Sequence, residues 1–305
     1  MKKLIRAEIG YCIKTKLIFM LIILFGVYTL LSSFMLSRMS SLQATLFEHQ
    51  IEYYEASGDD VEESIKQGYS ILESGTIENP IAYYHSEAQN LISYILPKNT
   101  PASFFQLCIM SVPVLSVLLA AILVSCDEKN HTKKLKVARS GKLTYHLSKR
   151  IAGLLLMFFI LIVSFLLLFC FNCFFYKTLS GNYDLSYYHF RSYSAGVLCR
   201  QFAFAVLSAI WWFELCYVLC DLIRNYVVVC TFITLCAMFF KPFSKYDPLN
   251  ALSAVEYKLF TFDGIIHPGE PIPAQFGLLV AEIIAILVAA VLIHILVNKR
   301  RSAFS

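Results

Sequence analysis

Long uninterrupted runs of apolar residues dominate this sequence. A helix needs about 20 apolar residues to cross a hydrocarbon core about 30 Å thick. Five runs reach that size, namely Leu17–Leu36, Ala102–Ser125, Ile151–Tyr176, Gln201–Cys220 and Phe276–Val297. A sixth run, Tyr226–Phe240, spans only about 22 Å as a helix, so it ends within the bilayer or borrows flanking residues. The pattern predicts an all-α polytopic membrane protein with six transmembrane helices.

The segment before the first run, residues 1–16, predicts an amphipathic interfacial helix. Leu4, Ile9 and Ile13 recur at helical spacing, and the basic residues lie mostly elsewhere on the helical wheel. An ordinary basic topology anchor is the alternative. The first run is longer than the apolar core of a signal peptide and has no convincing small-x-small cleavage site after it, so we expect it to be retained.

The basic residues are unevenly distributed between the polar segments, and this predicts the orientation. Of the 26 Lys and Arg residues, 17 lie in segments 1–16, 126–150, 221–225 and 298–305, whereas 15 of the 21 acidic residues lie in segments 37–101, 177–200 and 241–275. Because cytoplasmic loops carry an excess of Lys and Arg, we expect both termini in the cytoplasm. The net charge of +5 is then a topological signal and does not indicate binding to nucleic acid.

Two polar segments on the predicted outer side have a distinctive composition. Segment 37–101 is acidic and predicts a small helical extracellular insertion, with helix breaks at Ser57–Asp60 and Glu78–Pro80. Segment 241–275 holds several prolines that forbid one long helix, so we expect an outer re-entrant or interfacial segment there. Its apolar residues are predicted to form a dry outer gate, namely Phe243, Leu249, Leu252 and Leu259.

Candidate catalytic chemistry is absent from the sequence. The chain contains no nucleotide-binding G-x-x-x-x-G-K-[ST] pattern, no H-E-x-x-H, no G-x-S-x-G and no paired histidines at metal-ligand spacing. None of the ten cysteines lies in segment 38–101, and the pair Cys170 and Cys173 lies in an apolar run, where packing is the usual role. We therefore expect no catalytic residue, no metal, no disulfide framework and no cofactor in this chain.

Two carboxylates fall inside the predicted spans, Glu214 in the fourth and Glu282 in the sixth. An ionisable group in the bilayer costs several kcal/mol, so it normally faces a cavity or a partner. Both are therefore candidates for residues that line a transport path through the membrane. A structural hydrogen bond to a neighbouring helix is the alternative.

The most specific stretch lies between the second and third spans and reads Ser125-Cys126-Asp127-Glu128-Lys129-Asn130-His131-Thr132-Lys133-Lys134-Leu135, followed by Arg139 and by Ser148-Lys149. It resembles the acidic-x-x-G-T-x-[KR] pattern and the later Ser-Lys pair of the membrane subunits of type-2 ABC exporters. The matching residues are Asp127, Glu128, Thr132, Lys133, Ser148 and Lys149. His131 stands where that family usually has glycine. The order of spans and loops is also similar over nearly the whole chain.

This resemblance implies a permease subunit in the bacterial cytoplasmic membrane. Segment 126–150 would be the coupling loop that docks on a separate ATPase subunit, which binds ATP and Mg²⁺, and the residues implied in coupling are Asp127, Glu128, Thr132, Lys133, Arg139, Ser148 and Lys149. A second permease copy or a paralogue would complete the path as a homodimer or heterodimer. The resemblance favours an amphipathic peptide or a hydrophobic small molecule as the exported substrate.

Two other classes of function remain open at this point. A secondary transporter or channel would use an intramembrane glutamate as a proton or cation site, although no inverted repeat is visible in the hydropathy. A membrane sensor or immunity protein would bind a peptide on the acidic outer insertion.

Overall fold

The computed structural model describes residues 1–129, 132–239, 244–260 and 270–300. In chain order the elements are α1 (Lys2–Lys14), α2 (Leu17–Ser57), α3 (Val61–Lys66), β1 (Ser70–Ile71), β2 (Ile77–Glu78), α4 (Pro80–Ile95), a 3₁₀ turn (Pro97–Asn99), α5 (Thr100–Lys129), α6 (Lys133–Ser140), α7 (Lys142–Asn182), α8 (Ala195–Ile223), α9 (Tyr226–Phe239), α10 (Pro248–Leu259) and α11 (Phe276–Arg300). Apart from the two-residue strands, every regular element of the described chain is a helix, so it is an all-α multi-pass membrane protein.

Within the described residues, five helices are long and apolar enough to cross a membrane, and they contain the five long runs of the sequence. They are α2, α5, α7, α8 and α11. Helix α9 is apolar but has only 14 residues, or about 21 Å. Five of the six predicted spans therefore have a helix of sufficient length, and the sixth stays a prediction.

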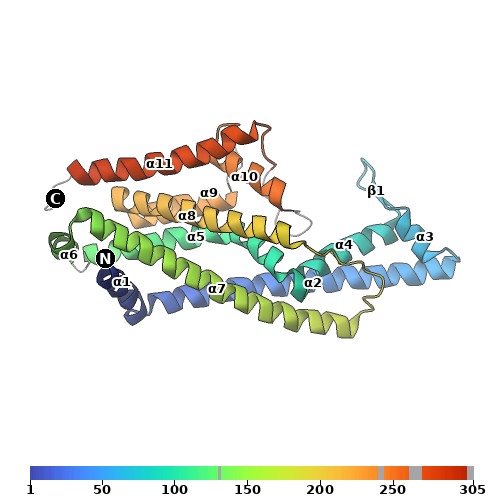
Figure 1. The fold of residues 1–305 in the computed structure, drawn as a ribbon. Helices are drawn as coiled ribbons and strands as arrows, with labels where there is room; N and C mark the ends of the chain where they lie inside the picture. Colours follow the sequence, from blue (N-terminus) through green and yellow to red (C-terminus); the bar gives the residue numbers. More distant parts are fainter. Residues whose placement is uncertain (130–131, 240–243, 261–269, 301–305) are drawn as a thin grey trace.

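Helices α2 and α7 extend well beyond the spans predicted for them. Each has 41 residues, which corresponds to about 60 Å. Figure 1 shows the two running side by side along the molecule. The helix that contains the first predicted span therefore does not end at Leu36 but continues unbroken into the predicted insertion.

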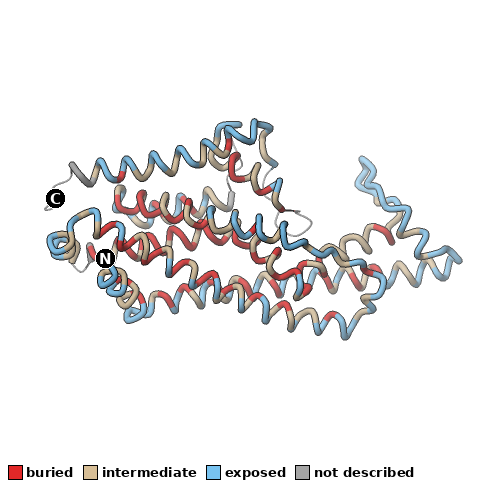
Figure 2. Tube along the Cα trace, viewed as in Figure 1, coloured by how far each residue is buried: buried red, intermediate tan, exposed pale blue. Residues whose placement is uncertain are grey.

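Helix α5 lies at the centre of the bundle. In its most apolar stretch 67% of the residues are buried, compared with 6% in α11. Figure 2 shows buried positions concentrated along α5 and the helices next to it, whereas α11 is mostly exposed. The large exposed hydrophobic side chains on α2, α7 and α11 form the surface expected of helices in contact with lipid.

A second layer covers one end of the bundle. It consists of the last turns of α2, with α3, the β1–β2 hairpin and α4 (Figure 1). It has its own apolar cluster, in which Phe47, Ile92 and Tyr188 are buried. The expected breaks are present, since Gly58 follows α2 in a left-handed conformation (φ 82°) and Pro80 begins α4. The hairpin was not predicted.

The opposite end of the bundle carries α1, α6 and the last turns of α11 (Figure 1). We call it the basic end, because the segments rich in Lys and Arg, 1–16 and 126–150, lie there. Helix α1 packs against α7, and α6 folds back against the first turns of α7. The basic end therefore gathers the predicted interfacial helix and the predicted coupling loop.

Gly153 allows α7 to approach its neighbours closely. A Cβ atom at this position would overlap the buried ring of Phe213 on α8 and lie 2.8 Å from Cδ1 of Leu123 on α5. We expect Gly153→Ala to lower the free energy of unfolding by about 1–3 kcal/mol, because a well-packed core resists added volume. A thermal or denaturant melt of the purified protein measures this change.

The matched control is Gly181→Ala on the same helix, where a Cβ atom would meet nothing within 4 Å. Because alanine favours helix more than glycine does, this variant should be at least as stable as the parent. Equal destabilisation by both substitutions would contradict the close packing at Gly153.

Candidate functional site

The carboxylate of Asp127, at the last turn of α5, is the centre of a buried polar network. Asp127 is 1% exposed. Its Oδ2 lies 2.8 Å from Nζ of Lys149 on α7 and accepts a hydrogen bond of 2.8 Å from the hydroxyl of Tyr145. Its Oδ1 accepts hydrogen bonds of 2.7 Å from Nζ of Lys136 on α6 and from the hydroxyl of Thr132. One carboxylate thus ties α5, α6 and α7 together.

Lys136 extends this network to α1. Its Nζ also donates to Oε1 of Glu8 at 2.5 Å, and Glu8 is 2% exposed. Burial alone would lower the pKa of Lys136, but the bonds with Asp127 and Glu8 outweigh burial and raise it. Because its pKa is raised, Lys136 remains charged at neutral pH. The stability that this raised pKa contributes is lost only when pH rises above the usual range of a lysine.

A second carboxylate, Asp221 on α8, forms an adjoining network. Its Oδ1 accepts a hydrogen bond of 3.0 Å from Nζ of Lys133 on α6, and its Oδ2 lies 3.0 Å from Nε2 of His294 on α11. Asp221 is 1% exposed and His294 is 2% exposed. Lys133 and Lys136 therefore fasten α6 to two different carboxylates.

Arg150 on α7 joins the same region from the membrane side. Its Nη2 lies 2.9 Å from Nδ1 of His294, and its Nε lies 3.3 Å from a carboxylate oxygen of Glu214 on α8. The guanidinium also lies over the ring of Tyr217. Glu214 therefore has an ion-pair partner inside the bundle.

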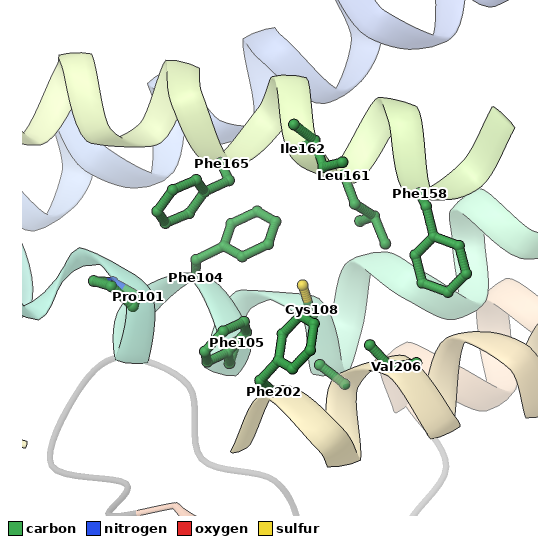
Figure 3. A pocket seen from close by; sticks show the side chains of 11 residues that line it. Pro101, Phe104, Phe105, Cys108, Phe158, Leu161, Ile162, Phe165, Phe202 and Val206 are labelled. Carbon is green, nitrogen blue, oxygen red and sulfur yellow. The ribbon is translucent and has the colours of Figure 1, made fainter. Parts of the chain in front are cut away.

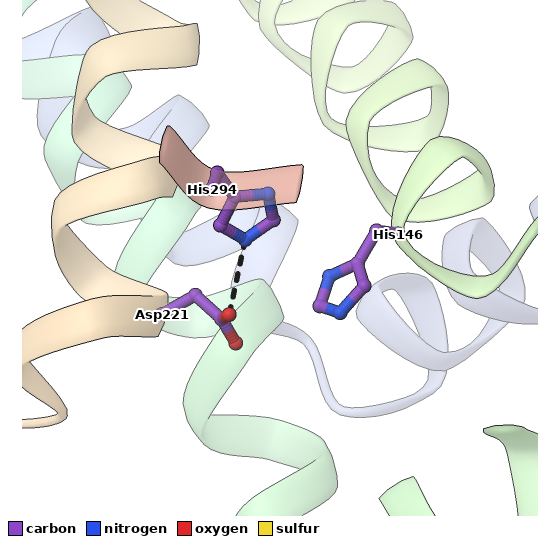
Figure 4. Close-up of side chains that lie close together, drawn as sticks. All are labelled: His146, Asp221 and His294. Carbon is purple, nitrogen blue, oxygen red and sulfur yellow. Dashed lines mark hydrogen bonds and ion pairs between the residues drawn. The ribbon is translucent and has the colours of Figure 1, made fainter. Parts of the chain in front are cut away.

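His146, Asp221 and His294 lie together, with one possible metal-ligand atom from each within 4.8 Å of the others (Figure 4). This group is not visible in the sequence, where its members are about 75 residues apart. Because arginine only donates, Nδ1 of His294 accepts from Arg150, and Nε2 then carries the proton that Asp221 accepts. Both nitrogens of His294 are thus occupied, and Nδ1 of His146 lies 2.9 Å from the hydroxyl of Tyr217. The donor set fits a hydrogen-bonded network better than a metal site.

The residues implied in coupling divide into two groups. Asp127, Ser148 and Lys149 are buried within the chain, with 1% exposure each. These three side chains are therefore buried within the single chain, and the role in coupling implied for them stays a prediction. Arg139 is exposed on α6, whereas the side chain of Glu128 lies outside the described residues.

On α6, Lys133 and Lys136 face the bundle, as does Thr132 just before the helix. The opposite side of α6 is exposed. The exposed residues on that side are Lys134, Leu135, Ala138 and Arg139. Leu135 is 61% exposed. This side of α6 therefore carries one large apolar side chain and two cations at the surface.

The predicted outer gate lies at the other end of the spanning bundle. Leu252 is buried in the main hydrophobic core, Leu249 packs against that core, and Leu259 is half-buried at the end of α10. Helix α10 packs against α11 and α8, so it is not separate from the bundle. Phe243 lies outside the described residues. Glu256, a buried polar residue of α10, was missed by the sequence reasoning.

Glu282, the other residue of the predicted path lining, lies half-exposed on α11. A separate apolar cavity of about 240 Å³ lies between α5, α7 and α8 (Figure 3). Its wall is rich in aromatic rings, namely Phe104, Phe105, Phe158, Phe165 and Phe202. Neither Glu214 nor Glu282 lines it.

Comparison with known proteins adds no family to this description. No protein-family model, no curated protein and no solved structure matches the chain.

The buried position of Asp127 gives a direct test of the network. We expect Asp127→Asn to lower the free energy of unfolding by about 3–5 kcal/mol, because Lys149 would remain buried without its carboxylate. Removing both charges with Asp127→Asn and Lys149→Met should cost less than the single change. Denaturant unfolding of the purified variants measures both. The control is Asp59→Asn at an exposed turn, and a loss there as large as at Asp127 would contradict the assignment.

Proposed function

We propose that this chain is the permease subunit of an ATP-driven exporter. Its six transmembrane helices, including α9, have both termini in the cytoplasm, and the chain resides in a bacterial cytoplasmic membrane. Two such subunits, identical or paralogous, form the path. Separate nucleotide-binding subunits bind ATP and Mg²⁺ and hydrolyse the nucleotide.

The observation that carries this proposal is the arrangement of α6. One side of this short helix is bound to the bundle through Lys133 and Lys136, which reach Asp221 and Asp127. The other side is exposed and carries Leu135 and Arg139. A helix that is bound to the bundle on one side and exposed on the other is suited to be displaced by a protein that binds its exposed side.

Ion pairs with buried carboxylates would transmit such a movement from α6 to the other helices. Lys133 reaches α8, and Asp221 continues to His294 on α11, while Lys136 reaches α5 and α1. Charge-assisted hydrogen bonds near 3 Å are short and directional, so a displaced α6 would displace these helices with it. Closure of an ATPase dimer would thereby favour one arrangement of the helices over another.

The charge distribution supports the orientation. Helices α1 and α6 lie at the same end of the bundle (Figure 1), and segments 1–16 and 126–150 hold half of the chain's 26 basic residues. The layer at the far end comes mostly from acidic segment 37–101. The positive-inside rule then assigns the basic end to the cytoplasm.

The far half of the bundle supports export of a largely apolar substrate. The phenylalanine-lined cavity between α5, α7 and α8 accepts apolar or aromatic groups. Helix α10, with Leu252 in the main core, is suited to close the exit as the predicted gate. The pairing of Glu214 with Arg150 disfavours a transporter that uses Glu214 as a free proton or cation site.

The proposal is tested by purifying the tagged chain from membranes of its native host. We expect a nucleotide-binding subunit to co-purify and to hydrolyse ATP. A double substitution on the exposed side of α6, Leu135→Asp with Arg139→Glu, should reduce the amount of that subunit at least tenfold, because it reverses charge and removes apolar contact. Quantitative mass spectrometry of the eluate measures the ratio.

The matched control changes the same residue types at the far end, with Leu72→Asp and Arg191→Glu, both exposed. This variant should retain the nucleotide-binding subunit. If no such subunit co-purifies with the unmodified chain, or if the two variants retain it equally, the proposed function is wrong.

A further inference from the structure

A cavity of about 360 Å³ lies at the basic end, between the first turns of α7 and the last turns of α11. Its lining residues are Lys142, Leu143, His146, Leu147, Arg150, His294 and Ile295. The cavity adjoins the Asp221 network through His146 and His294, and none of the four exposed α6 residues lines it.

The polar part of the lining is suited to an anion. Lys142 and Arg150 are cationic, and no acidic side chain lines the cavity among the described residues. Lys142 is also the first residue of α7, so the positive end of that helix dipole lies at the cavity. Arg150 and Glu214 are an ion pair, yet a guanidinium has five donors, and the contacts with Glu214 and His294 engage only Nε and Nη2.

The apolar part of the lining indicates where that anion comes from. Leu143 is 70% exposed, and Leu147 and Ile295 are each 42% exposed. Ile295 lies at the end of a helix long and apolar enough to span a membrane, so this wall lies where the hydrocarbon core meets the headgroups. A soluble anion would leave the exposed leucine and isoleucine side chains uncovered, whereas a lipid would cover them with its acyl chains.

We propose that this cavity binds the phosphate headgroup of an anionic glycerophospholipid from the leaflet at the basic end. Lys142 and Arg150 contact the phosphate, and the glycerol and upper acyl chain lie along Leu143, Leu147 and Ile295. Basic pockets between transmembrane helices bind anionic headgroups in this manner. Because α11 has so little buried surface of its own, a lipid held between α7 and α11 adds contacts that fasten α11 to the bundle. The proposal does not depend on the ATPase partner.

The test is a lipid titration of the delipidated full-length protein in detergent, followed by native mass spectrometry. The probes are phosphatidylglycerol, phosphatidylcholine and inorganic phosphate. We expect phosphatidylglycerol to bind at least fivefold more tightly than phosphatidylcholine. Lys142→Gln should weaken phosphatidylglycerol binding about fivefold, as expected for the loss of one cation at a membrane surface.

Two further variants separate the cavity from general basic charge. Leu147→Trp fills the cavity without a change in charge and should weaken phosphatidylglycerol binding as well. Lys14→Gln removes an exposed cation of the basic end that does not line the cavity, and binding should be unchanged. A melt without added lipid verifies that each variant is folded.

Three results would overturn the proposal. Equal affinity for phosphatidylcholine would show that the site does not recognise negative charge. Binding of inorganic phosphate alone with the affinity of phosphatidylglycerol would indicate a soluble anion as the ligand. An effect of Lys14→Gln equal to that of Lys142→Gln would show that the attraction is spread over the surface and is not confined to the cavity.

Discussion

The carboxylate of Asp127 is the interaction on which the basic end of the bundle depends. A buried charge costs several kcal/mol unless partners surround it, and here Lys149, Lys136, Tyr145 and Thr132 all donate to it. These donors come from α6, from α7 and from the segment just before α6, so satisfying one carboxylate fixes the path of the chain after α5. Helix α1 is included because Lys136 also binds Glu8. Because the lysines of α6 must reach the buried carboxylates, the opposite side of this helix is left exposed.

The second carboxylate, Asp221, changes what this arrangement can do. With Asp127 alone, α6 would be anchored only to helices next to it in sequence. Lys133 also connects α6 to α8, and His294 connects Asp221 to α11. A small basic helix between two spans is thus coupled to most of the bundle through buried polar contacts, which resist bending more than a solvated loop does. This coupling is the physical basis for assigning α6 the role of receiving motion from a partner.

The apolar runs were sufficient to predict the long helices, because the length and composition of a span are local properties. The breaks at Gly58 and Pro80 were also predictable from local backbone preferences. The unbroken extension of α2 was not, because a change from apolar to polar residues alters a helix's surroundings without ending it. The pairing of Lys133 with Asp221 joins positions 88 residues apart, and no local pattern encodes such a pair. For the same reason Asp127, in a charged segment, was expected at a partner's surface and is buried.

Site-specific photo-crosslinking in native membranes shows what touches α6 while the complex is intact. A photoreactive amino acid at Leu135 is predicted to form an adduct with a nucleotide-binding subunit, whereas the same group at Tyr69, exposed at the far end, forms none. If position 135 yields no such adduct, or if both positions yield it equally, α6 is not the docking helix. The contacts of α6 with Asp127 and Asp221 then do not serve to couple the bundle to an ATPase.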